Sequence, residues 1–472
     1  MLPWLVVTVT YVLLASIANL PAWIHGPTHE IQNYGGDLSE GVWFVAVTPY
    51  SLLHGHNPFF TNYINYPYGA NLMTNTTMFF PGVVLAPITF IWGSVATFNV
   101  LMVLAIAGSA TAAFAVFLRW APWKPAAFAG GLLYGFSPYV SGAGYGHLNV
   151  LIIVFPPLLL LLLDNVLVRQ RGNPFGWGAL LGLVAVCQFF TSTDVLASSA
   201  VMALAGTVVL IVSRPRQLSA KVGFATKSLA TGAAIFVLLC AYPIHVLLSG
   251  PQHIVGTTQP LNALAGFSSD LLSSVFPTLN EAISPSALQH VANLFVYHDY
   301  SENGAYIGVP LLLVMLALVV RFRRLAVVRF ATAMVVIAYI MSLGGRLRVD
   351  GRLTVVRLPF DVFRHLPLLD NLLAVRFSSY VFLFAGMILA VGMDRIHGDA
   401  TVPRRRLWAG SACALAAFSL FPLIPHWPYD FRDIQVPAFF DTSAVDTVPQ
   451  GSVLLPYPFP TGFHADSMIW QA

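Results

Sequence analysis

Long runs of apolar residues recur along this chain, and they restrict its fold more than any other feature. A run of about 18 or more apolar residues is long enough to cross the hydrocarbon core of a membrane as a helix. Of the 472 residues, 57% are hydrophobic and 9% are charged, against roughly 25% charged residues in an average soluble protein. The sequence therefore predicts an all-α polytopic membrane protein.

Eleven apolar segments fit transmembrane helices. The first, at about residues 3–23, also has small residues near its end, as a signal peptide does. It lacks a preceding basic residue and is longer than a typical signal sequence, so a retained helix is favoured. The other ten lie at about residues 95–118, 125–141, 149–168, 175–191, 195–213, 228–249, 304–320, 329–345, 375–394 and 407–425.

The distribution of charge supports this arrangement. With a cytoplasmic N-terminus, the short inner loops hold 16 of the 23 basic residues, as the positive-inside rule requires. Residues 79–93 are apolar but bracketed by Pro81 and Pro87, and counting them as a crossing would invert every later loop. They are expected to form a re-entrant or interfacial helix. Three long outer segments follow, at residues 24–78, 250–303 and 346–374.

The C-terminal segment, residues 426–472, differs from the predicted transmembrane domain of residues 1–425. Residues 428–430 and 449–458 are turn-bounded stretches typical of short strands. We expect them to begin a small outer domain that is cut short, or a tail that packs on the membrane part.

Other classes of protein have little support. The net charge is +4 and the basic residues are spread between segments, so nucleic-acid binding is not indicated. Cys187, Cys240 and Cys413 lie in apolar runs without ligand spacing, which predicts buried thiols and no metal or disulfide site. A transporter or flippase would place ionisable residues in mid-membrane. The predicted spans hold almost none.

The first outer segment contains the leading catalytic candidates, Asp37 and Glu40. Gly35 and Gly36 precede them and allow close backbone approach to a bound group. The apolar residues that follow predict an amphipathic helix along the membrane. Asp37 with Glu40 three residues later also fits a capping box, so a structural role and a catalytic role both remain open.

Further candidates for substrate binding are polar or aromatic residues of the outer segments. His56 and Asn57 lie in a turn, and Tyr66 lies in a turn-rich stretch whose rings could stack on a sugar or sit at the interface. His298 and Glu302 belong to a dense polar cluster just before a predicted span. Helix capping and surface turns are the alternatives for these residues.

The third outer segment breaks the positive-inside rule with a cluster of arginines. Arg364 and Arg376 are the preferred contacts for an anionic, lipid-linked phosphate, because a guanidinium binds phosphate oxygens in a bidentate manner. Pairing with nearby aspartates is the alternative. The cluster also includes Arg346, Arg348, Arg352 and Arg357.

In its order of features the chain resembles the GT-C superfamily of polyprenyl-phosphate-dependent membrane glycosyltransferases, especially the bacterial multi-spanning type. The resemblance lies in a first span, a large outer loop with the stretch Gly36 to Glu40, the turns around His56 and Asn57, and many later spans. It implies an extracytoplasmic active face in the cell membrane. Many members carry paired acidic residues in this loop. This chain has a single Asp after two glycines, so no cofactor is assigned and a divalent metal remains an option.

The resemblance also implies a reaction. Asp37, with Glu40 second, would act as general base in an inverting transfer of sugar from a lipid-phosphate donor to a glycan, lipid or protein acceptor. Arg376 and Arg364 would neutralise the departing phosphate. The alternatives are a transporter or flippase of lipid-linked sugars and a non-catalytic glycosyltransferase-like scaffold.

Overall fold

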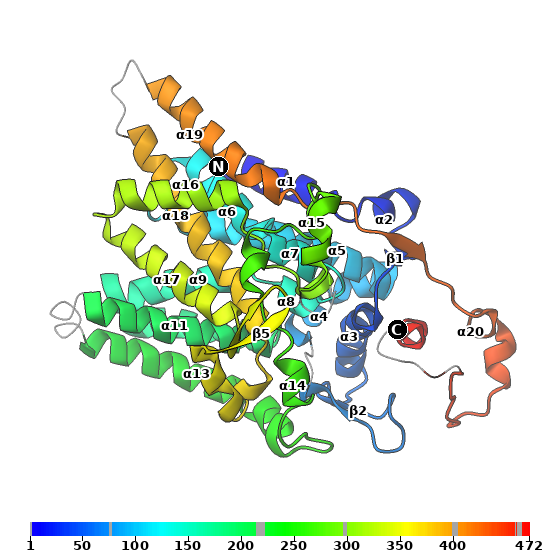
Figure 1. The fold of residues 1–472 in the computed structure, drawn as a ribbon. Helices are drawn as coiled ribbons and strands as arrows, with labels where there is room; N and C mark the ends of the chain where they lie inside the picture. Colours follow the sequence, from blue (N-terminus) through cyan, green and yellow to red (C-terminus); the bar gives the residue numbers. More distant parts are fainter. Residues whose placement is uncertain are drawn as a thin grey trace.

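The computed structural model describes residues 2–74, 78–213, 222–295, 300–398, 405–457, 459 and 465–472. Within these residues the protein is mostly helical with a few short strands, as predicted (Figure 1). A helix lies in each of the eleven predicted segments. These helices are α1 (Leu2–Ser16), α5 (Ala86–Phe117), α6 (Lys124–Gly135), α9 (Phe155–Leu163), α10 (Pro174–Phe189), α11 (Thr193–Ser213), α13 (Val222–Ser249), α16 (Val309–Phe322), α17 (Ala326–Ser342), α18 (Ser378–Gly398) and α19 (Arg405–Leu420).

Five helical stretches of the described chain are long and apolar enough to cross a membrane by length and composition. They define an integral membrane protein, whereas the number of eleven crossings and the side that each loop faces stay predictions. The five are Ala86–Phe117, Leu148–Arg169, Thr193–Ser213, Val222–Ser249 and Ala374–Gly398.

Residues 79–93 form two short helical pieces. One is α4 (Phe79–Val84), and the other is the first part of α5, which begins at Ala86 with a proline in its first turn. The helix breaks at Gly93, where φ is 87° and ψ is 170°. A left-handed φ is accessible to glycine without steric cost, so the long apolar part of α5 starts beyond this point.

Helix α18 forms the centre of the bundle, because nearly its whole length is buried. It packs against α6, α17, α19 and α16. At the α6 contact Gly130 and Gly386 face each other. A methyl group on Gly386 would lie 2.7 Å from the carbonyl oxygen of Gly130, so the absence of a side chain permits this close approach.

The C-terminal segment packs on the segment that contains β1 and α3. Strand β6 (Phe431–Asp433) pairs antiparallel with β1 (Glu30–Gln32), and α21 (Asp466–Gln471) lies against α3 (Gly36–Leu53). There the indole N–H of Trp43 donates a hydrogen bond of 2.6 Å to the side-chain oxygen of Gln471.

The strand expected at residues 428–430 begins slightly later, at Phe431. The strand predicted at residues 449–458 was wrong for its described part, which forms no strand. Leu455 is 73% exposed there. Prolines flank this stretch and offer no N–H for a ladder.

The remaining short elements connect these layers. The short helices are α2 (Leu20–His25), α7 (Pro138–Ala143), α8 (Leu148–Leu151), α14 (Leu261–Leu264), α15 (Ser286–Ala292) and α20 (Ala438–Asp441). The other strands are β2 (Phe60–Thr61), β3 (Ala70–Asn71), β4 (Arg346–Val349) and β5 (Arg352–Arg357), which pair as the hairpins β2–β3 and β4–β5.

The Gly130–Gly386 contact predicts a stability effect. Gly386→Ala should destabilise the protein by about 1–3 kcal/mol, because the added methyl group forces α6 and α18 apart. The measurement is the thermal midpoint of the purified protein in detergent. Gly410→Ala on α19 is the control, since its methyl group would meet nothing within 4 Å. Equal midpoints for the two variants would contradict the prediction.

Candidate functional site

Asp37 lies in the first turn of α3, where the structure corrects the capping interpretation. The N-cap is Gly35, which has an extended backbone and no side-chain cap. Asp37 is therefore free of a capping role, and its side chain is 61% exposed. A carboxylate in the first helical turn is favoured by the helix dipole.

His147 lies beside Asp37 and connects it to the protein interior. Its Nε2 is 2.8 Å from Oδ2 of Asp37, and its Nδ1 is 3.3 Å from Oε1 of Glu302. His147 directly precedes α8, and Glu302 ends the 3₁₀ helix η5 (Tyr300–Glu302). The side chain of Glu302 is only 4% exposed, so the imidazole bridges a surface carboxylate and a buried one.

Arg376 extends this arrangement deeper into the fold. It lies in the 3₁₀ helix η8 (Ala374–Phe377), just before α18. One guanidinium nitrogen is 3.0 Å from Oε1 of Glu302, and another forms a hydrogen-bonded ion pair with Oδ2 of Asp194 in the first turn of α11. We call the five residues Asp37, His147, Glu302, Arg376 and Asp194 the charge chain, because negative and positive groups alternate along it.

Burial and neighbouring charge set the protonation of the charge chain. Burial alone would raise the pKa of Glu302, but Arg376 and His147 outweigh it and hold that pKa at about 2. Burial would lower the pKa of His147, whereas the contacts with Asp37 and Glu302 raise it to about 10. The contact with His147 lowers the pKa of Asp37 despite partial burial. At neutral pH an imidazolium is thus held between two carboxylates.

The sequence left a divalent metal ion as an option. Among the described residues, no group of three or more His, Cys, Asp or Glu side chains is placed to hold a metal ion. Asp37 and His147 lie 2.8 Å apart, and the imidazole would have to be neutral to ligate a metal.

The other predicted residues lie outside the charge chain. Glu40 is half-buried on the next turn of α3. Arg364 lies 3.6 Å from Asp361, so the pairing alternative holds for it. His298 lies outside the described residues.

The predicted turn residues gather beyond the C-terminal end of α3. His56 Nδ1 is 3.3 Å from the hydroxyl of Tyr63, and Asn57 donates a hydrogen bond of 2.9 Å to the hydroxyl of Tyr242. Tyr66 is 59% exposed. Asp37 lies at the opposite end of this 18-residue helix, so these residues form a separate group.

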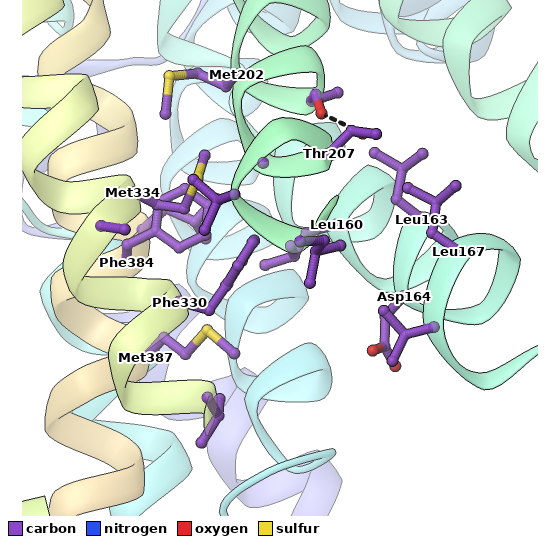
Figure 2. Close-up of a pocket in the computed structure, with 18 of the residues that line it drawn as sticks. Leu160, Leu163, Asp164, Leu167, Met202, Thr207, Phe330, Met334, Phe384 and Met387 are labelled. Atoms are coloured by element: carbon purple, nitrogen blue, oxygen red, sulfur yellow. Dashed lines mark hydrogen bonds between the residues drawn. The ribbon is translucent and has the colours of Figure 1, made fainter. Parts of the chain in front are cut away.

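A cavity of about 450 Å³ opens between α9, α11, α17 and α18 (Figure 2). Its wall is mostly apolar, with Phe330, Met334 and Phe384 among the residues that point into it. Three charged residues, Asp164, Arg169 and Arg329, also line it. At one end Tyr380 bonds to Ser199 at 2.8 Å. These two residues lie four or five positions beyond Arg376 and Asp194 on α18 and α11, so the cavity begins about one helical turn from the charge chain.

Sequence reasoning missed His147, Asp194 as a partner of Arg376, and the cavity. His147 is an isolated histidine between two apolar segments, where no spacing distinguishes it. The cavity is lined mainly by residues of four helices that are far apart in the sequence. The polar cluster that contains Glu302 was the sequence feature that pointed to this site.

Three solved structures are similar to this chain. The arabinofuranosyltransferase AftD from Mycobacteria matches with a TM-score of 0.51 and 16% identity over 98% of this chain. An Archaeoglobus fulgidus oligosaccharyltransferase tethered to an acceptor peptide matches with a TM-score of 0.44 and 12% identity over 89% of this chain. The oligosaccharyltransferase AglB of that organism, in complex with an inhibitory peptide and a dolichol-phosphate, matches with a TM-score of 0.45 and 13% identity over 95% of this chain.

The chain spans 30% of AftD and 54% and 58% of the two archaeal structures. No protein-family model matches it, and no curated protein matches its sequence significantly. The likeness to AftD shows a shared fold, and this fold agrees with the GT-C resemblance seen in the sequence.

The charge chain predicts a pH-dependent contribution of His147 to stability. His147→Gln should lower the free energy of unfolding by about 1.5–3 kcal/mol, because two charged contacts are lost. The raised pKa means that this contribution is complete below the unfolded value of 6.5 and is lost as the pH rises through about 10. Thermal midpoints of the two proteins should therefore differ most near pH 6 and converge above pH 10.

The exposed His54 supplies the matched control for this measurement. His54→Gln should shift the midpoint little at either pH. A gap between wild type and His147→Gln that stays constant up to pH 11 would contradict the proposed charge state.

Proposed function

We propose that the protein transfers a sugar from a polyprenyl-phosphate-linked donor to an acceptor hydroxyl at the outer face of the membrane. The observation that carries this proposal is the exposed carboxylate of Asp37, fixed by His147 at 2.8 Å. It lies in a fold shared with AftD, an arabinofuranosyltransferase. Fold alone does not establish activity, so the argument depends on what the charge chain can do.

Asp37 is suited to act as the general base. Its side chain is exposed, ionised and held by His147 and the helix start. As the acceptor oxygen attacks the anomeric carbon, its proton passes to Asp37 and the bond from that carbon to the donor phosphate breaks. Attack opposite the leaving phosphate inverts the anomeric configuration. A base of this kind contributes typically about 10²- to 10⁴-fold to the rate.

His147 and Arg376 are positioning residues in this mechanism. Arg376 already directs two guanidinium nitrogens at Glu302 and Asp194. It therefore fixes the two buried carboxylates, which already balance its positive charge. The sequence predicted that Arg376 contacts the phosphate directly. For that contact, Arg376 would have to give up its ion pair with Glu302 or Asp194.

The cavity provides a place for the lipid chain of the donor. Its apolar wall begins about one turn from Asp194 and Arg376, so a phosphate near the charge chain could continue into a lipid that lies along α11 and α18. The lining of α11 runs from Ser199 to Ser213, which corresponds to roughly 20 Å at a rise of about 1.5 Å per residue. That length suits several isoprene units of a polyprenyl chain.

The base role predicts the effect of Asp37→Asn. Transfer should fall about 10²- to 10⁴-fold, because the amide cannot accept the proton, while the yield of folded protein stays near wild type. The readout is the lipid-linked or cell-wall glycan that disappears on deletion, quantified by mass spectrometry in cells carrying the variant. Asp441→Asn, at an exposed site on α20, is the control. An unchanged glycan would exclude the base role and favour a non-catalytic scaffold.

The cavity predicts a selective effect of Gly206→Phe. The ring would fill the cavity beside Phe330, whose ring carbon lies 3.4 Å from the position of an added Cβ. KM for a long-chain lipid donor should rise at least tenfold, with little change for a donor with one isoprene unit. Leu204→Phe is the control, because Leu204 is 67% exposed and lies outside the lining. Equal effects on both donors would contradict the lipid assignment.

A further inference from the structure

The hairpin of β4 and β5 contains a β-bulge, and the apolar residues at this bulge are exposed. Arg346 pairs with Arg357, and Arg348 pairs with Leu353. Between these pairs Leu347 is the one residue of β4, whereas β5 has three. The two surplus residues form a bulge, and Val355 at its middle is 95% exposed.

The opposite end of the hairpin is fixed in the protein. The turn residues Asp350 and Gly351 donate backbone hydrogen bonds of 3.2 and 2.8 Å to the carboxylate of Asp270, which is fully buried. Strand β4 begins four residues after α17 ends at Ser342. The hairpin is thus held next to the end of α17, a predicted membrane helix, with Val355 of its bulge exposed.

The exposed surface of the hairpin combines apolar and basic side chains. Leu353 is 56% and Val356 is 48% exposed, beside Val355. Three arginines of the same hairpin are also exposed, at positions 346, 352 and 357. Exposure of apolar side chains such as Val355 and Val356 to water is unfavourable. The three arginines would attract anionic groups. Neither half of this surface contributes to the charge chain.

We propose that the β4–β5 hairpin binds the headgroups of anionic phospholipids and inserts its bulge into the membrane surface. Arg346, Arg352 and Arg357 contact the phosphates, and Leu353 and Val355 enter the boundary of the acyl chains. Position after α17 and charge complementarity favour a lipid surface over a protein partner. The proposal does not depend on glycosyl transfer.

The size of the electrostatic part follows from membrane physics. One basic side chain near an anionic surface is worth about 1 kcal/mol, which corresponds to roughly a fivefold change in partitioning. Three arginines should therefore make the contact strongly dependent on anionic lipid. The apolar residues should keep part of the contact in neutral lipid, because burying their surface does not require charge.

The test uses the full chain with Cys413→Ser and Val355→Cys, labelled with bimane and reconstituted in phosphatidylcholine vesicles with or without 30% phosphatidylglycerol. Lipids with a spin label near the headgroup end of the acyl chain should quench the bimane. Phosphatidylglycerol should increase this quenching several-fold. Ser452→Cys, an exposed position in the C-terminal segment, is the matched control and should show little quenching. Quenching at Val355 no greater than at Ser452 would overturn the insertion.

A second variant separates charge from apolar contact. Changing Arg346, Arg352 and Arg357 to Gln should abolish the increase caused by phosphatidylglycerol and leave the quenching in neutral vesicles. Quenching that never depends on phosphatidylglycerol would overturn the headgroup contact. A blue-shifted bimane that lipid does not quench would instead indicate that a polypeptide strand covers β5, and would also overturn the proposal.

Discussion

The buried carboxylate of Glu302 is the constraint on which the candidate site depends. Its side chain is only 4% exposed, and it remains ionised because Arg376 lies 3.0 Å and His147 3.3 Å away. Removing one member of a buried ion pair typically costs about 3–5 kcal/mol, because the other charge is left without compensation. The pairing of Glu302 thus fixes where two cationic side chains lie.

This pairing joins parts of the chain that are far apart in sequence. Glu302 ends η5, Arg376 lies just before α18, and Asp194 lies in the first turn of α11. His147 then extends the order to Asp37 at the start of α3. The packing of the helix ends therefore fixes the position of the exposed carboxylate of Asp37. A general base requires this kind of preorganisation.

The helical core and the charge chain support each other. Gly130 and Gly386 allow α6 and α18 to pack closely, and α18 directly continues the segment that carries Arg376. The apolar cavity lies against the same helix on another side. A lipid chain and a charged reacting group could therefore meet at one end of α18 without placing an unpaired charge inside the bilayer.

Local sequence was sufficient to predict the helices, because membrane helices are encoded by continuous apolar runs that need no partner to be recognised. It was also sufficient to place Asp37, Glu302 and Arg376 among the candidates, since ionisable residues inside the predicted spans were few and the search was limited to the segments between them. It did not show that Asp37 is not the N-cap of α3. The structure shows this, because the extended backbone of Gly35 takes the N-cap position.

The sequence by itself therefore determined the membrane class, the helical segments and most of the polar candidates. Only the tertiary structure decided that Asp37, His147, Glu302, Arg376 and Asp194 form one charge chain, and that Arg364 does not join it. The physical reason is that buried charges select their partners by distance in space, and those distances arise from the packing of helix ends that no local pattern records.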